Sequence, residues 1–106
     1  MIRPDAPADQ GGLAFLIHRE GDDVAVAVRD TQPGQAVGAS LEDGQRFSVA
    51  VRAAIPLGHK VALRDLAAAQ AVTEYGVTIG VTREAITAGD LVHTHNIRSA
   101  RWHSSL

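Results

Sequence analysis

The apolar segments of this chain are short, and each of them ends at a turn signal. The first, Leu13 to His18, runs into Gly21-Asp22-Asp23, and an alternation of Val and Ala over Val24 to Asp30 follows at once. Alternation with a period of two places the valines on one face of a strand. The two segments therefore predict a β-hairpin, and Pro33-Gly34 after them predicts a tight turn in which glycine supplies the positive φ.

The rest of the chain continues this pattern and predicts a mostly β fold with one or two short helical turns. Alanine favours helix near residue 65, but the Pro and Gly residues on either side leave little room for a long one. The expected elements are a strand at Arg46–Ile55 broken by Pro56 and Gly58, a strand at Val61–Leu63, a helical turn at Arg64–Ala68, a strand at Val77–Thr82, a one-turn helix or loop at Arg83–Asp90 closed by Gly89, and a last strand at Leu91–Ile97.

One short phrase recurs along the sequence. The charged pairs Arg29-Asp30, Arg64-Asp65 and Arg83-Glu84 each precede a short turn and a return to valine. The corresponding unit is a strand, a one-turn corner and a new strand, which favours a compact, bent fold. Chance similarity of alanine-rich corners is the alternative interpretation.

Composition narrows the function classes. The chain has 106 residues, enough for one domain, with 45% apolar but only 4% aromatic residues. A net charge of -2 without a basic stripe argues against nucleic-acid binding. The absence of cysteine excludes disulfides and thiolate metal sites and fits a cytoplasmic location. No apolar run is long enough for a membrane span, and residues 1–12 have no secretory-signal centre, so we expect a disordered leader there.

His93 and His95 are the first candidate site residues. Two positions apart on a strand, they would share a face with Cα atoms about 7 Å apart, within reach of one metal ion. A third ligand would have to come from elsewhere. Hydrogen bonding to a substrate carboxylate, acid–base work and simple exposure remain alternatives, and Asn96 follows on the other face.

His59 and Lys60 form the second candidate pair. They follow the rigid turn Pro56-Leu57-Gly58, which would hold both side chains at the start of a strand. A lysine there attracts carboxylates and a histidine titrates near neutral pH, whereas the plain alternative is a solvated turn.

The remaining polar and aromatic residues carry weaker signals. Tyr75 could offer its hydroxyl to a substrate, although capping of an aromatic-poor core is favoured. Arg64-Asp65 and Arg83-Glu84 are expected in surface ion pairs or corner hydrogen bonds. No site role is expected for His18 or His103, and Trp102 is either a core plug or, slightly favoured, an anchor at a partner interface.

Three stretches together resemble a known family. They are "IPLGHKVALRDL" (Ile55 to Leu66), "YGVTIG" (Tyr75 to Gly80) and "ITAGDLVHTHNI" (Ile86 to Ile97). The chain is similar over Leu13 to Trp102 to the small amino-terminal domain of the altronate and galactarate dehydratases, and to the separate small subunit of related lyases such as sulfolactate sulfo-lyases. One departure is Ala69, at a corner where glycine is expected; alanine there would need a negative φ or carry strain.

The resemblance implies a β-clip fold of the SAF type over residues 13–102, with a tail at 103–106. It implies a small subunit that completes the active site of a separate large dehydratase subunit, is inactive alone, and acts on a hydroxy acid such as altronate or galactarate. Iron would be held mainly by the large subunit. The expected roles are catalysis for His59, Lys60 and His95, substrate binding for Tyr75, His93 and Asn96, and metal ligation for His93 and His95.

Three other readings stay open. The first is the small subunit of a sulfo-lyase acting on sulfolactate. The second is a non-catalytic module that binds a carbohydrate acid or serves assembly, since a fold does not fix a function. The third is a free-standing metal-binding protein. Self-association of the chain is open in each case.

Overall fold

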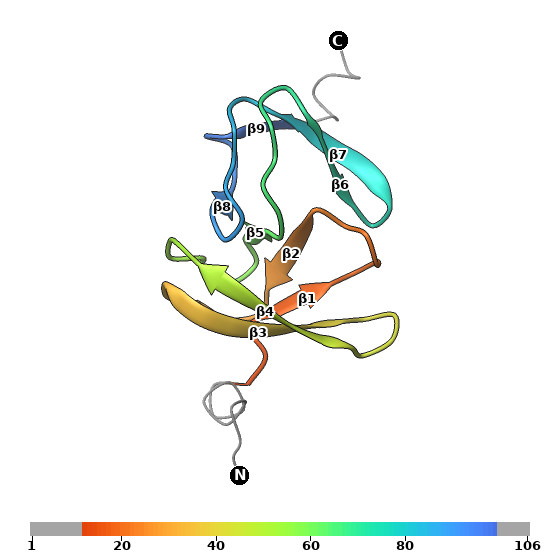
Figure 1. Cartoon of the computed structure of the whole chain (residues 1–106), viewed down its shortest axis with the longest axis vertical. Helices are drawn as coiled ribbons and strands as arrows, with labels where there is room; N and C mark the ends of the chain where they lie inside the picture. The colour runs from red at the N-terminus through yellow and green to blue at the C-terminus, as the bar shows by residue number, and fades with distance from the viewer. Residues whose placement is uncertain (1–11, 100–106) are drawn as a thin grey trace.

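The computed structural model describes residues 12–99. Within that range the regular secondary structure consists of β-strands (Figure 1). The strands are β1 (Phe15–Ile17), β2 (Val24–Ala27), β3 (Gly34–Ser40), β4 (Arg46–Val51), β5 (Lys60–Ala62), β6 (Ala71–Glu74), β7 (Val77–Thr82), β8 (Leu91–Val92) and β9 (Ile97–Ser99). The expected tail at 103–106, Trp102, His103 and all but the last residue of the expected leader lie outside the described residues. Within 12–99 there is no helix of the length and apolarity needed to cross a membrane.

The prediction of a mostly β fold is confirmed, but the helical turns are wrong. The segment Arg64–Ala68 contains Leu66, whose backbone N–H and C=O both pair with Ile86 at 2.8 Å. This isolated bridge uses the groups that a helical turn would need, so tertiary pairing overrides the helix propensity of the alanines. For Arg83–Asp90 the loop alternative is confirmed, because this segment supplies the other half of the bridge.

The strands form two sheets. Six strands pair in the order β4-β3-β1-β2-β5-β8, and three pair in the order β6-β7-β9. The expected hairpin is confirmed, since β1 and β2 are antiparallel with Phe15 opposite Ala27. β1 is also parallel to β3. In Figure 1 the three-stranded sheet lies in the upper part of the view, and β1 to β4 lie in the lower part.

The larger sheet curls until its two edges approach each other. Just after edge strand β4, the N–H of Arg52 donates to the C=O of Gly89, just before edge strand β8, at 2.9 Å. A Cβ on Gly89 would lie 2.0 Å from the carbonyl oxygen of Ala50, and the φ of Gly89 is +93°. Closure of the sheet therefore requires glycine at this position for two reasons: a side chain would collide with Ala50, and the backbone has a positive φ.

Apolar side chains gather in two clusters. One lies within the larger sheet and centres on Phe15, Ile55 and Val61, none of which is exposed. The other includes Val24, Leu66 and Val72 and so joins residues of both sheets. Apart from Phe15, the buried residues of both clusters are Val, Ile, Leu and Ala.

The recurring corners are confirmed as a structural unit, and the structure adds a fourth at residues 55–58. Thr31 bridges Ile55, and Leu66 bridges Ile86, so the four corners meet in two pairs. Three residues after each bridge residue the backbone has a positive φ, at Gly34, Gly58, Ala69 and Gly89. Ala69 thus takes the strained option, with φ of 58°.

The aspartates of the recurring phrase serve these corners. Asp30 Oδ1 accepts the N–H of Leu57 in the paired corner at 2.8 Å, and Asp65 Oδ1 accepts the N–H of Ala88 at 2.9 Å. Both carboxylates therefore cap the turn of the partner corner. The corner hydrogen bond expected for Asp65 is confirmed.

Candidate functional site

The last expected strand, Leu91–Ile97, is wrong, and this changes the geometry of its histidines. β8 ends at Val92, residues 93–96 form a turn, and β9 begins at Ile97. The C=O of His93 accepts the N–H groups of Asn96 and Ile97, both at 2.9 Å. His93 and His95 are exposed in this turn, so the argument that they share one face of a strand no longer applies.

Asn96 explains why the chain turns here. Its side chain is buried, with Oδ1 accepting the N–H of His93 at 2.9 Å and Nδ2 donating to the C=O of Leu91 at 2.8 Å. Asparagine is a turn former for this reason, because its amide replaces backbone partners. The structure therefore gives Asn96 a structural role in holding His93, rather than the exposed position expected of a substrate-binding residue.

His59 and His93 are brought together across two strands. Lys60 of β5 pairs with Val92 of β8, which aligns the residue before one strand with the residue after the other. The two imidazole rings lie 4.9 Å apart between centroids with a tilt of 50°. His59 follows the Pro56-Leu57-Gly58 corner as expected, and Leu57 is 61% exposed beside it. The turn is therefore rigid and carries an apolar tip.

Lys60 contacts Glu74, whereas the preceding residue, His59, contacts His93. Adjacent strand residues point to opposite faces, and the Nζ of Lys60 lies 3.8 Å from Oε1 of Glu74 on β6. Glu74 is buried, with a side chain that is only 3% exposed. A carboxylate in such a place is costly unless it is paired and hydrogen-bonded.

Tyr75 lies in the two-residue turn between β6 and β7. Glu74 pairs with Val77, and Tyr75 and Gly76 have φ values of 60° and 75°, the conformation of a type I′ hairpin. The expected core role is wrong, because Tyr75 is 53% exposed. Its ring stacks on His18 with centroids 4.0 Å apart, and its hydroxyl lies 3.2 Å from His18 Nε2.

His18 and Glu74 are the residues that sequence reasoning missed. His18 Nδ1 faces Glu74 Oε2 at 3.4 Å, yet neither atom makes a hydrogen bond within residues 12–99. We refer to His18, Lys60, Glu74 and Tyr75 as the Glu74 cluster. A signal was present, since Glu74 falls two residues after Val72 and hence on the core face of its strand.

Two other buried carboxylates fix the turn of this cluster. Asp22 accepts backbone N–H groups from Arg19, Tyr75 and Gly76 at 3.0 to 3.2 Å. Asp23 accepts the N–H of Thr73 at 2.9 Å and pairs with Arg64 at 3.2 Å. The expected surface role of Arg64 is thus confirmed as an ion pair, and the type I′ turn is anchored to the β1–β2 connection.

The described residues do not form a metal site by themselves. No group of three or more His, Asp or Glu side chains within 12–99 is arranged to hold an ion. His59 and His93 supply two imidazoles, and a catalytic iron or zinc commonly takes three or more protein ligands. Metal ligation by His93 and His95 therefore stays a prediction that needs ligands from another chain.

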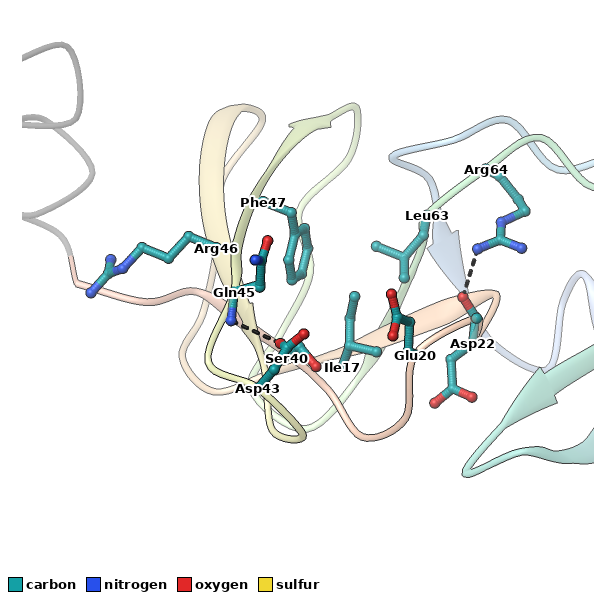
Figure 2. Close-up of a pocket in the computed structure, with 11 residues that line it drawn as sticks. Ile17, Glu20, Asp22, Ser40, Asp43, Gln45, Arg46, Phe47, Leu63 and Arg64 are labelled. Atoms are coloured by element: carbon teal, nitrogen blue, oxygen red, sulfur yellow. Dashed lines mark hydrogen bonds between the residues drawn. The ribbon is translucent and has the colours of Figure 1, made fainter.

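A pocket of about 340 Å³ lies between the β1–β2 connection and the β3–β4 hairpin, away from His59 and His93. Figure 2 shows the side chains of Ile17, Phe47 and Leu63 converging there while Arg46 extends outward, and Arg64 donates to the C=O of Asp22 at its far end. None of the residues nominated from the sequence lines this pocket.

Comparison with known proteins decides the family. Residues 13–100 match the altronate/galactarate dehydratase SAF domain. The chain belongs to this family. The resemblance drawn from the three sequence stretches is confirmed.

The relatives are lyases or lyase subunits. The (2R)-sulfolactate sulfo-lyase subunit alpha of Chromohalobacter salexigens is 38% identical over 92 residues, which cover 85% of this chain and 98% of the relative. The protein of the same name from Paracoccus pantotrophus is 42% identical over 60 residues, or 57% and 90% of the two chains. The altronate dehydratase of Escherichia coli is 41% identical over 78 residues, covering 74% of this chain but 15% of the relative.

Proposed function

We propose that this SAF domain is the small subunit of a carbon–sulfur lyase that releases sulfite from a sulfonated hydroxy acid of the sulfolactate type. The observation that supports the proposal is the share of each relative's length that aligns with this chain. The chain aligns with 98% and 90% of two sulfo-lyase alpha subunits, but with only 15% and 16% of two altronate dehydratases. The expectation of altronate or galactarate as the substrate is less well supported, and it becomes the alternative.

The reaction sets clear demands on the site. A base removes the proton next to the carboxylate, and the electron pair of the broken C–H bond forms a C=C bond while sulfite leaves from the neighbouring carbon. The developing charge needs cationic or hydrogen-bonding groups near the carboxylate. Loss of water from altronate makes the same demands with a different leaving group.

The residues of this chain suit the edge of such a site. His59 and His93 present two adjacent imidazoles, which are the side chains best suited to proton transfer near neutral pH. Lys60 supplies a positive charge next to His59 in the sequence, with its ammonium beside Glu74. His95 lies in the same turn as His93, and its catalytic role stays a proposal.

The large subunit would supply the remaining groups. The exposed residues 93–95 of the turn and the exposed Leu57 beside His59 suit contact with a second chain. Iron, where the assembled enzyme uses it, would be held mainly by that partner, because the described part of this chain lacks a complete ligand set. The curled sheet and paired corners are in keeping with the β-clip fold proposed from the family.

The direct test is reconstitution. The 106-residue chain would be assayed for sulfite release from (2R)-sulfolactate, and for dehydration of altronate and galactarate, with and without a large chain of the same family. We expect sulfite release only from the pair. Dehydration of altronate without sulfite release would instead favour the alternative substrate class.

A non-catalytic role is the competing proposal from another class. Replacing both His59 and His93 with alanine discriminates between the two. If the assembled enzyme keeps its rate and metal content, this chain serves docking or recognition alone.

A further inference from the structure

The Glu74 cluster contains a buried carboxylate that the fold does not need. Three buried acidic side chains lie close together, and two of them, Asp22 and Asp23, are fully used by backbone N–H groups and Arg64. Glu74 is different, because its Oε2 is buried and makes no hydrogen bond within residues 12–99. A buried polar atom without a hydrogen bond is unfavourable, so packing alone gives no reason for it.

The two side chains beside this carboxylate, His18 and Lys60, lie between it and the surface. His18 Nδ1 is 3.4 Å from Oε2 and Lys60 Nζ is 3.8 Å from Oε1, while these side chains are 23% and 33% exposed. Each of them therefore has one side toward Glu74 and one side toward solvent. Lys60 is also the only lysine in the sequence, where every other basic side chain apart from histidine is arginine.

The stack of His18 on Tyr75 leaves hydrogen-bonding capacity unused. The hydroxyl and Nε2 are hydrogen-bonded at 3.2 Å, and the two rings stack with an angle of 28° between their planes. A phenol hydroxyl can donate one hydrogen bond and accept another, so Tyr75 keeps capacity for a further partner.

Further positive charge lies beside the tyrosine turn. A Cβ on Gly76 would come within 2.9 Å of the Cδ of Arg19, so glycine allows the arginine side chain to cross the turn. The exposed groups of the region are therefore an ammonium, an imidazole, a phenol and a guanidinium. All four can donate hydrogen bonds, and three acids lie behind them, Asp22, Asp23 and Glu74, all of them buried.

We propose that His18, Lys60 and Tyr75 bind an oxyanion of an organic acid, and that Glu74 is the positioning residue that holds His18 and Lys60 in place. The Lys60 ammonium and the Tyr75 hydroxyl, which is hydrogen-bonded to His18 Nε2, would donate to the anion, while Glu74 faces the inner side of His18. The proposal rests on the proposed function only for the nature of the anion, a carboxylate or sulfonate of the substrate.

The test uses the free 106-residue chain, so it does not depend on the large subunit or on activity. The ¹⁵N signals of the His18 ring and of the single Lys60 ammonium would be followed by NMR during titration with sodium methanesulfonate and, separately, sodium acetate. Sodium chloride at the same ionic strength is the control for screening. His95, exposed in its turn, is the internal control residue.

We expect saturable shifts of His18 and Lys60 with at least one of the two acids, and none at His95. The acid that saturates identifies the chemical source as sulfonate or carboxylate. Shifts that match those in chloride would overturn the anion site, whatever the outcome of the reconstitution assay.

Variants test the individual roles. Tyr75→Phe and Lys60→Met should each weaken anion binding at least fivefold, while Val77→Ala on the same hairpin should leave the affinity unchanged. For Glu74→Gln, net charge alone predicts tighter anion binding, whereas positioning predicts binding at least fivefold weaker. Equal or tighter binding in Glu74→Gln, with an otherwise unchanged amide spectrum, would remove Glu74 from the proposal.

Discussion

The imidazole of His59 lies against that of His93, with 4.9 Å between the ring centroids. One residue precedes β5 and the other follows β8, and the ladder pair Lys60–Val92 brings them together. The Gly-His-Lys and His-x-His-Asn motifs of the sequence thus meet at one place through their first histidines. This pairing, rather than the spacing of His93 and His95, is the geometry on which a shared chemical role depends.

Replacement of either paired histidine should impair the assembled lyase. We expect His59→Ala and His93→Ala each to lower kcat/KM by about 10²-fold or more, in the range typical of a general acid or base. The measurement is steady-state sulfite release by the reconstituted pair of chains. His95→Ala is the matched control, and we expect a smaller loss because no contact ties it to His59. A loss from His95→Ala that exceeded both others would contradict the role given to the pair.

The buried amide of Asn96 should be needed for stability. Asn96→Ala removes the bonds to His93 N and Leu91 O and leaves both groups without those partners. We expect the free energy of unfolding to fall by about 2 to 3 kcal/mol. Urea denaturation of the free chain measures this, with the exposed Thr94→Ala in the same turn as a control expected within about 0.5 kcal/mol. Equal losses in the two variants would show that the amide is not what holds the turn.

Ala69 offers the opposite change. Its φ of 58° is a left-handed conformation that costs a residue with a Cβ about 1 kcal/mol or more. We expect Ala69→Gly to raise the free energy of unfolding by up to about 1 kcal/mol, because glycine relieves the strain. The gain is limited because glycine also increases the entropy of the unfolded chain. The neighbouring Ala68→Gly lacks the strain and should be destabilising. If both substitutions lowered stability alike, the corner would not be strained.

The carboxylate of Asp22 should contribute strongly to the stability of the fold. It accepts three N–H groups, including those of Tyr75 and Gly76, from a buried position. Asp22→Asn replaces one accepting oxygen by a donor, so we expect a loss of about 2 kcal/mol in the free energy of unfolding. The exposed Asp43→Asn, where one N–H from Gln45 is accepted, should cost less. Thermal denaturation of both variants is the comparison, and a cost at Asp22 no larger than at Asp43 would be the opposing result.

Local chemistry made much of the fold predictable. Val–Ala alternation and Gly-Asp turns located the first hairpin, and Val77–Thr82 was predicted with the bounds it has. Proline and glycine punctuation predicted the corners. The pairing of corners could not be predicted, because Thr31–Ile55 and Leu66–Ile86 join residues far apart in sequence through backbone groups that any residue carries.

The candidate site was predictable in its residues but not in its arrangement. His59 and Lys60 stood out because they follow a rigid turn, and His93 stood out because His95 lies two residues after it. The turn at 93–96 was missed because alternation from Leu91 to Ile97 resembles a strand, and only the buried amide of Asn96 reveals the reversal. Glu74 and His18 were missed because single polar residues at the ends of short strands are commonly solvated, and their contact joins segments far apart in the sequence.

The most direct test of the proposed function is sulfite release from (2R)-sulfolactate by the purified 106-residue chain, measured with and without its large partner chain. We predict no turnover by either chain alone and full turnover by the pair. Full turnover by the 106-residue chain alone, or by the large chain without it, would contradict the proposal that this SAF domain completes an active site formed mostly by another polypeptide.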